Sequence, residues 1–183
     1  MLIIRILLSQ RMKKMRRFIP IAALAGTLLI ALHAGAQAQK DPLNDEEVDQ
    51  IREVADRPPE RVKVYMKFIE QRVAAIKQMS SDPHVVNKPA KLRSLMEEFT
   101  RLVDELQDNL SNYDEGHSDI RKPLKDLIAS SAKWPEVLNT PPADRAYDFS
   151  RKTALEAAQS AGEQSAKLLD DQNKYFAEHK KGH

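Results

Sequence analysis

The stretch from Leu92 to Tyr113 carries the feature that most restricts the fold of this chain. Its large apolar residues recur three or four positions apart, with Asn109 at the one polar step: Leu92, Leu95, Phe99, Leu102, Leu106 and Tyr113. Charged or polar residues fill most of the other positions. This spacing puts the apolar side chains on one face of an α-helix, and it predicts a long helix that packs inside a helical bundle.

Two further segments have helical spacing. Between Pro59 and Met79, one apolar stripe predicts a second helix: Val62, Met66, Ile69, Val73 and Ile76. Between Asp144 and Glu178, the predicted inward face consists mostly of small residues: Tyr147, Ala154, Ala158, Ala161, Ser165 and Leu168. A face of small side chains lets a neighbouring helix approach closely.

Caps and prolines set the expected helix ends. Asn44 followed by Glu47 has the pattern of a capping box, so a helix is expected to start directly after Asn44. Pro58-Pro59 interrupts that helix, because proline lacks an amide proton and restricts the residue before it. Two prolines and several turn-forming residues predict a loop at 80–89.

These elements predict an all-α fold, an elongated antiparallel helical bundle of three long rods, or four to five helices counting the proline breaks. The rods are expected at residues 45–79, 91–133 and 144–178. Gly116 and Pro123 weaken the middle rod, and the pattern leaves open whether it is one kinked helix or two. No strand pattern competes with this interpretation.

The N-terminal segment 1–38 has the three parts of a cleavable signal peptide. Basic residues come first, an apolar run follows at 18–32, and small residues offer cleavage after Ala36 or Ala38. Met12 opens a conventional signal and is an alternative start to Met1. The apolar run, about 15 residues, is shorter than the roughly 20 that a membrane-spanning helix needs, so no stable membrane anchor is expected after cleavage.

The expected organisation is therefore a signal peptide at 1–38, a disordered lead at 39–43, a helical-bundle domain at 44–178 and a flexible tail at 179–183. The location predicted from it is periplasmic or secreted. The whole chain has a formal net charge of +2. Without the six basic residues of 1–38, 23 Lys and Arg face 27 Asp and Glu, a net charge of about −4. An acidic body argues against a nucleic-acid partner, which requires a basic surface.

The sequence predicts no metal site and no cofactor. Asp114, His117 and Asp119 lie close together at the helix break, but the chain has no cysteine and no paired-histidine motif. The remaining histidines after the signal are His84, His179 and His183. Non-covalent haem ligation would have to use residues such as Met66, Met79, Met96 and His179, and methionines at apolar helix positions are usually core residues.

No catalytic residues are predicted either. The adjacent acids at 97–98, 104–105 and 170–171 point about 100° apart on a helix, so they are expected to form a solvated face. Trp134, the only tryptophan, is expected to plug one end of the bundle; if it were exposed it would mark a recognition surface, and Tyr175-Phe176 poses the same question.

The function expected from these observations is non-enzymatic: protein–protein interaction in the bacterial envelope, with another envelope protein as the partner. Two alternatives stay open at this point. One is a periplasmic stress protein that holds unfolded clients or senses metals, and the other is a non-covalent haem-binding bundle. The sequence does not indicate the oligomeric state.

Overall fold

The computed structural model describes residues 41–179, so the predicted signal peptide and the residues after His179 lie outside the described residues. Six helices form within these residues: α3 (Asp45–Glu53), α4 (Pro58–Ser81), α5 (Lys88–Glu115), α6 (Arg121–Ser131), α7 (Trp134–Leu138) and α8 (Asp148–His179). No strand forms between residues 41 and 179. None of these helices is long and apolar enough to span a membrane.

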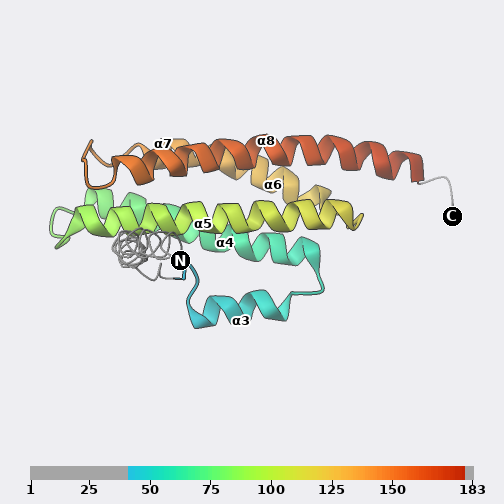
Figure 1. Ribbon diagram of the computed structural model, residues 1–183, viewed down its shortest axis with the longest axis horizontal. Helices are drawn as coiled ribbons and strands as arrows, with labels where there is room; N and C mark the ends of the chain where they lie inside the picture. Colours follow the sequence, from blue (N-terminus) through green and yellow to red (C-terminus); the bar gives the residue numbers. More distant parts are fainter. Residues whose placement is uncertain (1–40, 180–183) are drawn as a thin grey trace, which may run out of the picture. The chain divides into compact units, whose positions relative to one another are not determined.

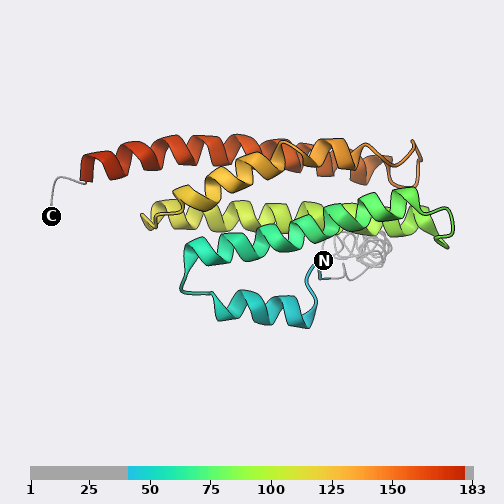
Figure 2. The same cartoon turned by 180° about the vertical axis from the view of Figure 1, so that it is seen from behind.

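The helices form an antiparallel bundle, which confirms the predicted fold class. α4 packs against α5, α5 and α6 pack against α8, and α7 bridges α4 and α8. Both side views show that α5 and α8 run in one direction, whereas α4 and the α6–α7 pair run back (Figures 1 and 2). The predicted rods 45–79 and 91–133 therefore each form helices that run in opposite directions: α3 and α4 in the first, and α5 and α6 in the second.

The core contains the apolar faces that the sequence predicts. The five stripe residues of α4 are buried, as are Leu92, Phe99, Leu102 and Leu106 of α5, whereas Leu95 and Tyr113 are partly buried. The small face of α8 is also buried, with Ala154, Ala161 and Ser165 at 0% exposure. The expected close packing of α8 follows from these small residues, because they bring its backbone near α5 and α6.

The reversal between α5 and α6 depends on His117. The amide of His117 donates to the carbonyl of Asp114 at 2.9 Å, and that of Ser118 donates to the carbonyl of Tyr113 at 2.9 Å. This is the Schellman pattern of a helix C-terminus, in which glycine usually takes the left-handed position. Here Gly116 has an ordinary φ of −80° and His117 takes the left-handed conformation, with φ 52°.

Helix α3 is held on α4 by a buried ion-pair cluster. The predicted capping box of Asn44 and Glu47 forms, with bonds of 2.9 and 3.0 Å. Arg72 of α4 donates to both carboxylate oxygens of Glu47 at 2.5 and 2.8 Å, to Glu98 of α5 at 3.2 Å and to the carbonyl of Pro42 at 2.6 Å. Its side chain is 12% exposed. Residues 41–43, expected to belong to a disordered lead, are thus tied to the bundle.

Trp134 is buried at 1% exposure, as expected. Its indole nitrogen donates to Glu70 of α4 at 2.9 Å, and its ring meets Phe99 edge-on with centroids 5.4 Å apart. Glu70 lies in the middle of α4, so Trp134 fills the interior between α4 and α5 rather than plugging a bundle end.

Tyr65 provides a test of the core at high pH. Its hydroxyl is buried and donates to Glu105, and burial together with this carboxylate raises its pKa from 10.0 to about 12. Because the folded state holds the phenol proton more tightly than the unfolded state, this contribution to stability is complete below pH 10 and is lost as the pH rises to about 12.

We therefore expect the wild-type free energy of unfolding to fall between pH 10 and 12, and Tyr65→Phe to fall less steeply there. At pH 7 the variant should be less stable by about 1–3 kcal/mol, because it lacks a hydrogen bond to a charged group. Urea unfolding followed by circular dichroism at several pH values measures both effects. Equal alkaline slopes for the two proteins would contradict the Tyr65–Glu105 bond.

Candidate functional site

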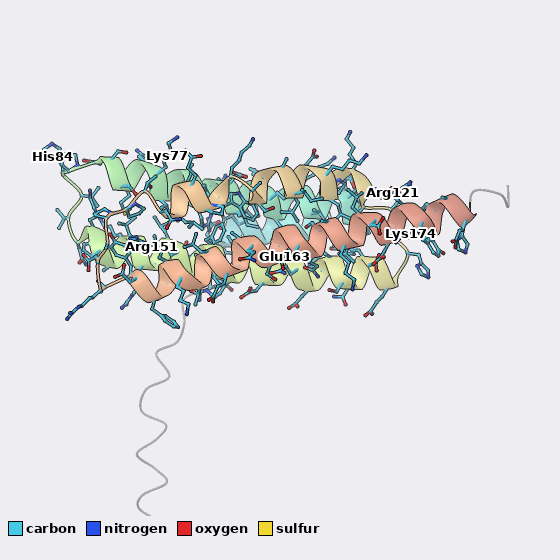
Figure 3. The ribbon with its side chains drawn as sticks, turned by 90° about the horizontal axis from the view of Figure 1, so that it is seen from above. Lys77, His84, Arg121, Arg151, Glu163 and Lys174 are labelled. Atoms are coloured by element: carbon cyan, nitrogen blue, oxygen red, sulfur yellow. The ribbon has the colours of Figure 1, made fainter. Side chains whose placement is uncertain are left out.

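An apolar groove lies between the C-terminal half of α6 and the N-terminal half of α8. It has a volume of about 470 Å³, and its walls are lined mainly by small and apolar side chains: Ile128, Ser131, Ala132, Pro135, Leu155, Ala158, Gln159, Gly162 and Glu163. Seen from above, α6 and α8 lie side by side, with Arg121 at the start of α6 and Glu163 near the middle of α8 (Figure 3).

Gly162 determines how closely the two helices approach in this groove. A Cβ atom at position 162 would lie 3.0 Å from the hydroxyl oxygen of Ser131, closer than ordinary packing allows. Ser131 is held in place by its own bond to the carbonyl of Ile128 at 3.1 Å. Glycine inside a helix costs about 1 kcal/mol relative to alanine. At position 162, however, the close approach of α6 to α8 requires glycine.

A basic hollow follows the groove along the same face. It is lined by Asp119, Arg121, Lys122, Lys125 and Asn173. On α6, positions 121, 125, 128 and 132 are four, three and four residues apart and share one face. On α8, positions 155, 162 and 173 are seven and eleven residues apart, close to two and three full turns. The hollow and the groove therefore lie on one α6–α8 face, which is apolar at one end and basic at the other.

Only some of the charged side chains in the hollow form ion pairs. Arg121 binds Asp119 through two bonds of 2.6 and 2.8 Å. This arginine also lowers the pKa of the Asp119 carboxyl. Lys122 and Lys125 are exposed and form no salt bridge to any residue in 41–179. Their positive charges, at this end of the α6–α8 face, can be neutralised by an acidic group of a binding partner.

A second hollow, the distal cleft, lies where the end of α5 meets the end of α8. It has a volume of about 190 Å³ and is lined by Asp114, His117, Asp171, Gln172, Tyr175 and Phe176. Gln172 forms its floor at 3% exposure. Its carbonyl oxygen accepts from the amide of Ile120 at 3.2 Å, and its amide donates to the carbonyl of Ser118 at 3.0 Å and to Asp114 at 3.3 Å.

Aromatic rings stack around this cleft. His117 stacks on Tyr175 with centroids 4.3 Å apart, and His179 stacks on Tyr175 at 4.0 Å. Two rings cannot share one face of a phenol at these distances, so the imidazoles cover its opposite faces. Nδ1 of His179 lies 2.7 Å from the carbonyl of Tyr175, and since a carbonyl only accepts, this nitrogen carries a proton. Tyr175 and Phe176, whose exposure the sequence left open, are both partly buried.

Of the residues considered for metal binding, Asp114 and His117 both line the distal cleft, whereas Asp119 lines the basic hollow. Asp114 contacts Gln172, His117 stacks on Tyr175 and Asp119 pairs with Arg121. Between residues 41 and 179 no three His, Asp or Glu side chains are placed to hold a metal ion. For haem, Met66 and Met96 are buried in the core, whereas His179 is exposed at the end of α8.

The expectation of a solvated acidic face is wrong for part of α5. Glu98 binds Arg72, and Glu105 accepts from Tyr65, so both carboxylates connect α5 to α4. At the end of α8, Asp170 pairs with Lys174 at 2.5 Å, whereas Asp171 lines the distal cleft.

Comparison with protein-family models, curated proteins and solved structures gives no match for this chain. Its candidate sites are therefore defined by their own geometry: the α6–α8 face and the distal cleft.

Proposed function

We propose that this chain is an exported, non-enzymatic binding protein of the bacterial envelope, and that its α6–α8 face holds an amphipathic helix of another envelope protein. The apolar groove between α6 and α8 carries this proposal. Its volume of about 470 Å³ is in the range of binding pockets, and its small side chains let a partner helix lie close. The export signal at 1–38 supports the location.

The charges on the face specify the partner's chemistry. A helix in the groove would place an apolar ridge, with residues three and four positions apart, against Ile128, Leu155 and Ala158. Acidic residues at one end would meet Lys122 and Lys125, which have no partner of their own among the described residues. Such complementary charges orient a partner and speed its association.

Filling the groove should weaken partner binding without unfolding the bundle. We expect Ala132→Phe to place a large ring in the groove, since Ala132 is exposed and lines it. Crosslinking of the intact protein in cell envelopes, followed by recovery and identification of partners, gives the readout. The partner recovered with wild type should bind the variant at least tenfold more weakly in titrations of the purified proteins.

Two control variants make the groove test specific. Ala129→Phe adds the same ring to another exposed position of α6 and should leave binding unchanged, because Ala129 does not line the groove. Lys125→Glu should weaken binding and reduce its salt dependence, whereas Lys63→Glu, at an exposed position of α4, should not. Equal binding by wild type and Ala132→Phe would exclude the groove as the binding site.

A further inference from the structure

We propose that α3 is an exchangeable arm, and that the strip of α4 around Lys67 and Arg72 also binds α3 of a second copy of this chain. The exchange gives a domain-swapped dimer, in which each bundle holds the α3 of the other copy. In both side views α3 lies on one side of α4 and α5, and α8 lies on the other side (Figures 1 and 2). The exchange therefore does not use the α6–α8 face and does not rest on the proposed function.

The attachment of α3 to the bundle is small and specific. α3 packs mainly against α4, and two of its side chains, Glu47 and Ile51, are buried. Glu47 accepts from Arg72 with both carboxylate oxygens, and Gln50 accepts from Lys67 at 2.8 Å. Each of these contacts joins a side chain of α3 to one of α4. The α3 of a second copy can therefore re-form all of them.

The turn between α3 and α4 determines whether the arm folds back onto its own chain. In this β-turn the amide of Arg57 donates to the carbonyl of Val54 at 3.0 Å, and Ala55 and Asp56 are the exposed central residues. Pro58 follows and favours extended backbone at Arg57, whose φ is −121°. Extended backbone at this point suits an opened arm, and a short hinge loop of this kind promotes domain swapping.

The remaining helices keep their core when the arm is open. Ile51 is the one residue of α3 in the buried apolar core, and all the other members lie at or after Val62. The short tether gives the arm an effective concentration of about a millimolar at its own α4. The closed monomer is therefore expected at low protein concentration, and the swapped dimer at high protein concentration.

Deleting Ala55 and Asp56 tests the hinge, because α3 can then no longer fold back onto its own α4. We expect the deletion variant to have twice the wild-type molar mass by light scattering, with α3 amides that exchange as slowly as in wild type. Inserting three glycines after Asp56 is the matched control; it keeps the reversal and should leave the protein monomeric. A monomeric deletion variant with fast amide exchange in α3 would overturn the proposal.

A crosslinking experiment tests the exchange in chains with an intact hinge, even if the deletion variant does not fold. The chain has no cysteine, so Gln50→Cys and Lys67→Cys are placed in separate copies, refolded together from urea at high concentration and treated with a short bismaleimide. We expect a 50–67 link between chains, identified by mass spectrometry. Lys77→Cys, about 15 Å further along α4, should give at least tenfold less link to position 50. Equal linking at 67 and 77, or no link at 67, would exclude the swapped arm.

Discussion

Replacing Trp134 by alanine should destabilise this protein by about 3–5 kcal/mol, the usual cost of removing a large buried aromatic side chain. Trp134 is 1% exposed, meets Phe99 edge-on and donates to Glu70. The variant would lose this packing, leave a cavity between α4 and α5, and deprive Glu70 of its donor. Denaturant unfolding followed by circular dichroism measures the change, because the substitution removes the only tryptophan.

Trp134→Phe separates packing from hydrogen bonding. Phenylalanine keeps a ring against Phe99 and loses only the indole N–H and part of the volume, so we expect less than half of the alanine effect. In the wild-type protein, fluorescence of Trp134 should shift to longer wavelength on unfolding, because the ring then enters water. A loss below about 1 kcal/mol for Trp134→Ala would show that the ring is not packed as described.

The fold could be predicted from the sequence where it depends on residues that lie close together along the chain. In α4, α5 and α8 the apolar or small residues recur three or four positions apart, so the sequence itself predicts which side chains are buried. The reversal after α5 was not predictable in this way. It requires a histidine, His117, in a conformation usually left to glycine, and a hydrogen bond that the amide of Ile120 donates to the side-chain carbonyl of Gln172. That bond joins residues 52 positions apart.

The candidate sites were mostly invisible in the sequence for the same reason. Asp114 and His117 stood out as possible metal ligands, yet their actual neighbours are Gln172 and Tyr175 of α8, which no spacing rule connects to them. The groove consists of small residues, whose effect depends on two helices meeting side by side. The sequence does not distinguish Arg72 from other charged helix residues, because its partners, Glu47 of α3 and Glu98 of α5, lie 25 and 26 positions away.

Arg72→Ala should release α3 from the bundle. The substitution leaves the Glu47 side chain, 7% exposed, without its cation, and breaking a buried ion pair costs about 3–5 kcal/mol. Undocking of α3 relieves this cost, because Glu47 then reaches water while the four long rods keep their core. We expect hydrogen exchange of the amides of Asp45–Glu53 to become at least a hundredfold faster, with little change in the core of α5.

Acid should produce the same selective release in the wild-type protein. The Arg72 guanidinium lowers the pKa of the Glu47 carboxyl below its ordinary 4.5, so the contribution of this pair to stability is present above pH 4.5 and is lost as the pH falls through the lowered value. Arg52→Ala is the matched control, since Arg52 pairs with Asp49 on the same helix but at 73% exposure, where ion pairs contribute little. This control should leave the exchange of α3 unchanged. If Arg72→Ala instead accelerated exchange equally in α3 and α5, the ion pairs would stabilise the whole bundle and α3 would not be a separately releasable element.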